Sequence, residues 1–143
     1  MRTARYCLLF LFALLTACDF ETSNNGDLDG YWQLHQLDTL ATGGSTDMRT
    51  STIYWAIQVN ILEIRRLSDL YGIMFRFDKG GGKLHISNPV CDDRSISDSL
   101  ITSAETLRPF GLLHTSETFN IETLNSDHFV ITNEAYRFHL RKY

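Results

Sequence analysis

Histidine, cysteine and aspartate are the residue types in this chain that could bind a metal ion. The histidines are spread along the sequence, at His35, His85, His114, His128 and His139. No two of them stand two or four positions apart, the spacings that place two ligands on one face of a strand or helix. We expect no metal site and no cofactor, although ligands from distant strands remain an alternative.

The sequence also lacks the usual arrangements for acid–base or nucleophilic catalysis. No Gly-x-Ser-x-Gly turn is present to hold a reactive serine. Asp92 and Asp93 are adjacent, so their side chains diverge in an extended chain and cannot act as a carboxylate pair. We therefore expect the protein not to be an enzyme.

Cys18 is the residue for which the preceding sequence specifies a reaction. Arg2 and Arg5 come before an apolar run over 7–15, and small residues ending in Ala17 lead directly to Cys18. A basic segment, an apolar segment and a small-residue cleavage site make a secretory signal peptide. Because the site ends in cysteine, it resembles the bacterial lipobox. The resemblance implies a signal peptide over 1–17 and lipid on the sulfur and amine of Cys18.

Two alternatives to lipidation remain open, namely an uncleaved membrane anchor and ordinary secretion. The apolar run to Ala17 spans about 11 residues, whereas a helix needs about 20 to cross a bilayer. A lipid anchor contributes about 0.8 kcal/mol for each buried methylene, so several acyl chains would hold the protein on a membrane surface.

Charge and cysteine content limit the partners and the fold of the mature chain. Loss of Arg2 and Arg5 leaves 11 of the 13 basic residues against 17 acidic ones, a net charge of −6. Such a chain is poorly suited to nucleic acid. Cys91 is then the only cysteine besides Cys18, so no disulfide can form within the domain and a hydrophobic core must stabilise it. Its length fits one domain.

Polar segments separate the candidate elements. Residues 18–29 lack hydrophobic periodicity and read as a lipidated tether, so the domain is expected over 30–143. Residues 39–52 and 88–114 read as long loops. The glycines at 80–82 join two alternating segments, which predicts a hairpin and not a phosphate-binding loop, because no helix pattern follows.

Alternation of apolar and polar residues predicts about eight short strands. They are expected at 31–37, 53–59, 60–66, 70–78, 83–87, 118–124, 127–132 and 135–142. A helix through 61–70 is the competing interpretation of one of these segments. Short strands joined by polar turns are typical of an antiparallel barrel or sandwich.

Gly30-Tyr31-Trp32 at the start of the first strand, the run of strands and a basic residue at the end of the last strand resemble lipocalins. More narrowly, the chain resembles lipocalin-like lipoproteins of unknown function from Bacteroides-type bacteria. That resemblance includes the lipobox, Leu107-Arg108-Pro109-Phe110-Gly111 and the closing segment 121–141. It implies a small, up-and-down, calycin-like β-barrel of about eight strands.

The resemblance also implies a plug at the closed end of the barrel. There Trp32 would lie across the base with a basic side chain packed on its ring, an interaction of roughly 0.5–2 kcal/mol. Arg141 is the first choice for that side chain and Lys142 the alternative. Trp32 as an ordinary core aromatic is the competing interpretation.

A small barrel can be filled by its own side chains, and we expect a mostly filled interior. Any ligand inside would contact bulky residues that alternation turns inward. These candidate ligand-lining residues are Trp55, Phe75, Phe77, Phe129, Tyr136 and Phe138.

The sequence thus favours a membrane-anchored protein that binds a small apolar or amphipathic ligand at the open end of the barrel. The alternative is a structural or interaction lipoprotein whose filled barrel contacts another envelope or host protein. Asp19 follows the lipidated cysteine and resembles an inner-membrane retention signal of enteric bacteria, but also a surface-export signal of Bacteroides-type bacteria. Because the chain resembles proteins of the second group, the outer membrane is favoured, facing the periplasm or the cell surface.

Overall fold

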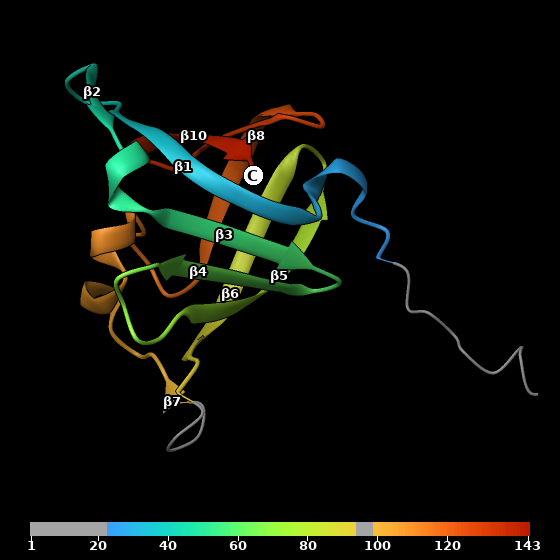
Figure 1. Cartoon of the computed structure of the whole chain (residues 1–143), viewed down its shortest axis with the longest axis vertical. Coiled ribbons are helices and arrows are strands. Elements are labelled where there is room, and N and C mark those ends of the chain that lie inside the picture. Colours follow the sequence, from blue (N-terminus) through green and yellow to red (C-terminus); the bar gives the residue numbers. More distant parts are fainter. Residues whose placement is uncertain (1–22, 94–98) are drawn as a thin grey trace, which may run out of the picture.

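Ten antiparallel strands of the described chain form one sheet that closes on itself (Figure 1). The structure is a computed structural model and describes residues 23–93 and 99–143. The predicted signal peptide and Cys18 lie outside the described residues. The strands are β1 (Gly30–Thr39), β2 (Gly44–Asp47), β3 (Ile53–Gln58), β4 (Ile61–Arg66), β5 (Ile73–Gly80), β6 (Lys83–Cys91), β7 (Ser99–Leu100), β8 (Glu117–Leu124), β9 (His128–Thr132) and β10 (Tyr136–Lys142).

Eight of the strands make the barrel wall. They follow the order β1-β3-β4-β5-β6-β8-β9-β10, and pairing of β10 with β1 closes the ring. β2 extends the outer half of β1, and β7 pairs with the end of β6. This confirms the predicted antiparallel eight-stranded barrel, and each of the eight predicted strands is present within a few residues of its expected bounds.

Four short 3-10 turns complete the described elements. They are η2 (Gly26–Leu28), η3 (Arg49–Ser51), η4 (Ala104–Thr106) and η5 (Arg108–Phe110). η2 lies at one end of the barrel, while η4 and η5 lie at the other (Figure 1). None of the helices in the described part of the chain is long and apolar enough to cross a membrane.

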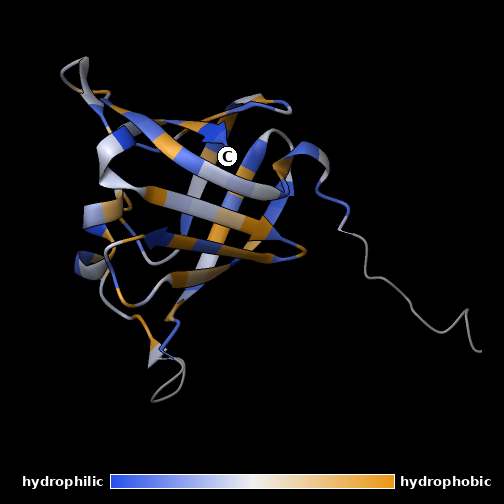
Figure 2. Cartoon of the chain, viewed as in Figure 1, coloured by the Kyte–Doolittle hydropathy of each residue, from blue (hydrophilic) through white to orange (hydrophobic). Residues whose placement is uncertain are grey.

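Alternation along the strands places one continuous core inside the ring. Figure 2 shows the alternation as hydrophobic and hydrophilic colours that change along the strands. A β-bulge in β1 falls between Leu34 and Gln36, so that His35 is the extra residue. Trp32 and Leu34 point inward before the bulge, and Leu37 packs against the core after it. A bulge shifts the alternation by one residue, which lets β1 continue to Thr39 with its apolar side still facing the core.

The structure confirms the strand expected over 60–66 as β4, and the competing helix over 61–70 is not formed. It corrects two other local expectations. The predicted loop 39–52 contains β2, which alternation could not reveal because all four of its residues are exposed and polar or glycine. In the predicted tether, η2 forms over 26–28 and Leu28 is wholly buried, so the folded part begins before Gly30.

Candidate functional site

Trp32 plugs one end of the barrel, which we call the base. Its indole Nε1–H donates to the carbonyl oxygen of Leu28 at 2.8 Å, and its ring packs 5.4 Å from that of Phe129. The Lys142 ammonium lies 4.5 Å from the Trp32 ring centroid and donates to the carbonyls of Asp27 and Asp29. Trp32 therefore has the plug position that the resemblance implies.

The cation on Trp32 is Lys142 and not Arg141, which corrects the first choice made from the sequence. In the β1–β10 register, Lys142 stands opposite Trp32 while Arg141 stands opposite Gln33. Residues opposite each other on paired strands project to the same face, so Lys142 shares the inner face with Trp32. Arg141 is exposed on the outside of the barrel.

The opposite end is covered by residues 104–112, which we call the lid. Leu107 and Leu112 are wholly buried, and Phe110 is only 8% exposed with the Arg66 guanidinium 5.4 Å from its ring centroid. Gly111 has φ +78°, and a Cβ added there would stand 2.9 Å from the Phe138 ring. The open end of the barrel, where the sequence placed a ligand, is thus closed by the lid, and Phe110 belongs to the core.

A buried carboxylate fastens the chain beside the lid. Glu117 accepts the backbone N–H of Leu113 at 2.9 Å and the side-chain amide of Asn133 at 2.5 Å. Asn133 also donates to the carbonyl oxygen of Gly111 at 3.1 Å. Burial raises the pKa of Glu117 above its ordinary value, although these hydrogen bonds act in the opposite direction.

The interior is filled by the side chains that the sequence nominated as ligand contacts. Trp55, Phe75, Phe77, Phe129 and Phe138 are buried in the core, and Tyr136 packs against it. The rings of Trp55, Phe119 and Phe138 lie 5.6–5.9 Å apart, centroid to centroid. None of the six lines any of the three hollows described below. They contact one another, as expected for a filled barrel.

Trp55 leaves one polar group without a partner. Its Nε1–H is fully buried and has no acceptor within the described residues. An unsatisfied buried donor costs about 1–3 kcal/mol. A ligand oxygen that entered the core and accepted a hydrogen bond from this N–H would remove that cost.

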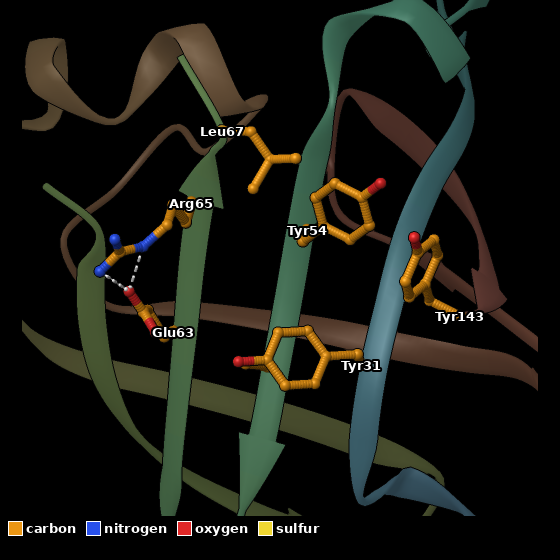
Figure 3. Close-up of a pocket in the computed structure, with 7 residues that line it drawn as sticks. Tyr31, Tyr54, Glu63, Arg65, Leu67 and Tyr143 are labelled. Carbon is orange, nitrogen blue, oxygen red and sulfur yellow. Dashed lines mark hydrogen bonds and ion pairs between the residues drawn. The ribbon is translucent and has the colours of Figure 1, made fainter. Parts of the chain in front are cut away.

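Three tyrosines frame a groove on the outer surface of β1, β3 and β4 (Figure 3). We call it the tyrosine groove; its volume is about 430 Å³. Its lining residues are Tyr31, Tyr54, Ala56, Glu63, Arg65, Leu67 and Tyr143. Tyr54 and Tyr143 meet edge to face at 5.5 Å, and Tyr31 and Tyr143 are 59% and 85% exposed. Such aromatic side chains offer apolar ring faces to a ligand.

The tyrosine groove also offers polar groups. The three tyrosine hydroxyls make no hydrogen bond within the part of the chain that the structure describes. Along the far wall, the Arg65 guanidinium is 2.6 Å from a Glu63 carboxylate oxygen (Figure 3). It is also 3.4 Å from a carboxylate oxygen of Asp92. Apolar faces beside fixed charges and free hydroxyls match an amphipathic ligand.

A second hollow, of about 690 Å³, continues from the tyrosine groove toward the base. It shares Tyr31, Ala56 and Glu63 with the groove and extends over 57–61 to Ser23. The outer face of β3 and β4 is therefore hollowed from the middle of the barrel to the point where the described chain begins.

A third hollow lies over the outer face of β1, where two histidines meet charged groups. His139 contacts Asp38 at 2.7 Å, while His35 lies beside Asp47 and Arg49. Burial acts to raise the pKa of Asp38, but hydrogen bonds from His139 and Gln36 outweigh it and lower the pKa.

The surroundings of this hollow disfavour the charged form of His35. Its pKa is lowered by burial, by Arg141 and by Arg49. Over residues 23–93 and 99–143, no three histidine, cysteine or acidic side chains are grouped closely enough to hold a metal ion.

The sequence nominated inward residues and missed the tyrosine groove. Tyr31 and Tyr54 occupy outward positions of strands whose inward residues include Trp32 and Trp55. Aromatic residues at outward positions are the signal that would have indicated a surface site. Tyr143 carries no such signal, because only the folded chain brings the last residue beside β3.

The comparisons with known proteins agree with this architecture. A family model described as "Lipocalin-like domain" matches residues 13–143. A crystal structure of a lipocalin-like protein from Bacteroides uniformis superimposes with a TM-score of 0.61 at 21% identity, covering 82% of this chain and 100% of that one. An uncharacterized protein from Bacteroides eggerthii gives 0.59 at 20%, covering 80% and 98%.

At these identities the two solved structures show the fold alone. No curated protein gave a significant match. The family model covers nearly the whole chain, including every strand of the barrel. The chain therefore belongs to the lipocalin-like domain family.

Proposed function

We propose that the protein is a non-catalytic binding module that holds a small amphipathic ligand in the tyrosine groove, on the outside of its barrel. One observation carries the proposal: the barrel interior is packed and covered at both ends, whereas the outer face of β3 and β4 is hollow and aromatic. Ligand sites in proteins are concave and largely apolar, with a few placed polar groups. The tyrosine groove has these properties, and its volume lies within the usual range of about 300–1,000 Å³.

The proposal includes attachment to the bacterial envelope through lipid on Cys18. The sequence before Cys18 supports this attachment. Acyl chains at Cys18 would keep the barrel at the outer membrane, where an amphipathic ligand is concentrated. Metabolic labelling with palmitate tests the attachment: the parent chain is expected to take up label, and Cys18→Ser is expected to lose it and leave the membrane fraction.

Native mass spectrometry of the protein purified from its own host tests the tyrosine groove. We expect the parent to carry a small bound molecule and Tyr54→Ala to lose it. Tyr71→Ala is the matched control, because Tyr71 is a 39%-exposed tyrosine that does not line the groove. A bound mass that survives Tyr54→Ala combined with Tyr31→Ala contradicts the site. A bound polypeptide in place of a small molecule favours the interaction role.

A ligand inside the barrel is the second candidate, and the unpartnered Trp55 Nε1–H is the observation that favours it. A ligand oxygen that entered beneath the lid would accept that hydrogen bond. Trp55→Phe keeps an aromatic side chain and removes the donor. Loss of the bound mass in Trp55→Phe, with retention in Tyr54→Ala, would place the ligand inside.

A further inference from the structure

The described chain begins at the base of the barrel, beside the turn between β3 and β4. The Asn25 side-chain amide donates to the carbonyl oxygen of Val59 in that turn at 2.8 Å. Lys79 donates to the carbonyl oxygen of Asn25 at 2.9 Å, and Ser23 lines the same hollow as Val59. These contacts hold the first described residues at the same end of the barrel as the turn (Figure 1).

Ser23 is five positions after Cys18, the site at which the lipid is proposed. A fully extended chain gains at most about 3.6 Å per residue, so Cys18 lies within about 18 Å of Ser23. A membrane that held the lipid would therefore be close to the base and remote from the lid.

The β3–β4 turn presents apolar side chains at this end of the molecule. Val59 and Ile61 are each 40% exposed, and the turn between the two strands is among the hydrophobic segments in Figure 2. Val59 has φ +55°, a left-handed conformation that two-residue hairpin turns normally give to Asn, Asp or Gly. A β-branched residue is strained there. A β-branched, 40%-exposed side chain held in this conformation is a local strain of the kind that is found at functional positions.

Tyrosines lie one step farther from the tip. Tyr31 stands opposite Ala56 in the β1–β3 register, three residues before Val59. At about 3.3 Å per residue, it lies about 10 Å along the strand from the tip. The backbone N–H of Tyr143 donates to the carbonyl oxygen of Tyr31 at 2.9 Å, which places the C-terminal tyrosine at the same level. Apolar residues at the tip with tyrosines above them follow the order found at membrane interfaces.

Charge contributes little to this surface. Arg76 donates to the Asn60 side chain at 2.9 Å, and Lys79 and Lys142 donate to carbonyl oxygens of the base. The carboxylates of Asp27, Asp29 and Asp78 belong to the same segments. Because both signs are present, a membrane contact here would rest on the apolar tip and not on charge attraction to the headgroups.

We propose that the β3–β4 turn is a membrane-contacting tip. Val59 and Ile61 enter the outer acyl region of the bilayer, and Tyr31 and Tyr143 lie at the headgroups. This inference rests on the proposed lipid attachment at Cys18. It gives the barrel a fixed orientation, base toward the membrane and lid away from it. The tyrosine groove then opens beside the headgroup layer, where a lipid-derived ligand can reach it without leaving the membrane.

Tryptophan reporters in the full-length acylated protein test the tip. The protein is reconstituted in phosphatidylcholine vesicles with brominated acyl chains, which quench tryptophan at acyl depth. Trp32 and Trp55 are fully buried and give the same background in every variant. We expect Val59→Trp to be quenched at least about twofold more than Leu70→Trp, because an inserted apolar tip reaches about 5–10 Å into the interface. Leu70 is 84% exposed in the β4–β5 loop, at the lid end.

Ile61→Trp is the second reporter and keeps the test valid if Val59→Trp does not fold. The proposed tip is contradicted if neither reporter is quenched more than the parent protein. It is also contradicted if Leu70→Trp is quenched as strongly as the two reporters. Vesicle flotation of the same samples separates this failure from failure of the attachment. A chain that floats with the vesicles without reporter quenching overturns the tip alone, and a chain that does not float overturns both.

Discussion

Two neighbouring basic residues at the end of β10 have different roles. Lys142 packs on Trp32 and donates to two carbonyls of the base, while Arg141 faces outward on the adjacent position. The difference follows from strand parity, since successive side chains of a strand point to opposite faces. Lys142 thereby joins the first described residues, the first strand and the last strand of the barrel.

Lys142→Met tests this role at the residue scale. We expect it to lower the free energy of unfolding by about 1–3 kcal/mol, because it removes the cation–π contact and two hydrogen-bond donors while keeping an apolar side chain. Arg141→Met is the matched control and should change stability by less than about 0.5 kcal/mol. Urea unfolding compares the two; equal losses would show that the Trp32 contact contributes nothing.

Trp32→Ala is expected to lower the free energy of unfolding by about 3–5 kcal/mol, as truncation of a fully buried large aromatic does. The indole packs on Phe129 and donates to Leu28, so the substitution removes packing and a hydrogen bond together. Tyr31→Ala, at the next and exposed position, is the control. A thermal melt unchanged by Trp32→Ala would contradict the plug.

At the scale of elements, the lid is an irregular segment held by a few specific contacts. Leu107, Phe110 and Leu112 bury its apolar side, and Gly111 allows its backbone to lie directly on Phe138. The only polar side chains buried in the described core are Glu117, Thr132 and Asn133, and two of these fasten the lid and the residues after it. Single substitutions in the lid should therefore weaken the packing that closes the end of the barrel opposite the base.

Gly111→Ala measures the close approach of the lid to Phe138. We expect a loss of about 2–4 kcal/mol, from the left-handed backbone and from the collision with the ring. Gly81→Ala isolates the first effect: Gly81 has φ +58° and no atom within 4 Å of an added Cβ, so about 1 kcal/mol is expected. Equal losses in thermal or urea unfolding would show that Phe138 moves aside freely.

Glu117 predicts a pH dependence of stability with a definite sign. Because burial raises its pKa in the folded state above the ordinary 4.5, the folded protein keeps this proton to a higher pH than the unfolded chain. Its contribution is fully present below about pH 4.5 and is lost as the pH rises through the folded pKa. Glu117→Gln, which cannot ionise, should therefore flatten the stability profile above pH 4.5. Identical profiles for parent and variant in urea unfolding would contradict this sign.

At the scale of the whole molecule, closure of the sheet has the stabilising role that disulfide bonds have in many secreted domains. Pairing of β1 with β10 joins residues 97 to 110 positions apart and closes the edges that these two strands would expose in an open sheet. The core is continuous from the base to the lid, so the barrel is expected to unfold as one cooperative unit.

Insensitivity to reductant follows from this construction. Cys91 is the one cysteine of the described residues and is free. We expect the melting temperature of the mature chain to be the same with and without a thiol reductant. A lower melting temperature in reductant would reveal a disulfide, for example between two copies of the chain, and calorimetry under both conditions makes the comparison.

Local pattern in the sequence determined the fold class of this protein. Alternation located the eight barrel strands, and the parity of the inward residues identified the core from Trp32 to Leu140. These features are local, because one buried face imposes a two-residue period on every strand. The signal peptide and the lipidation of Cys18 are likewise properties of a short segment, and they remain predictions outside the described residues.

Only the tertiary structure decided where a ligand can bind. Whether a barrel is open or filled depends on how side chains from eight strands and a lid share one volume, and no local period encodes that sum. The tyrosine groove is formed by β1, β3, β4 and the last residue. The β3–β4 turn is proposed as the membrane-contacting tip because the first described residues contact it. Both depend on contacts between segments far apart in the sequence. For that reason the sequence nominated the inner face, whereas the folded chain offers its hollow on the outer one.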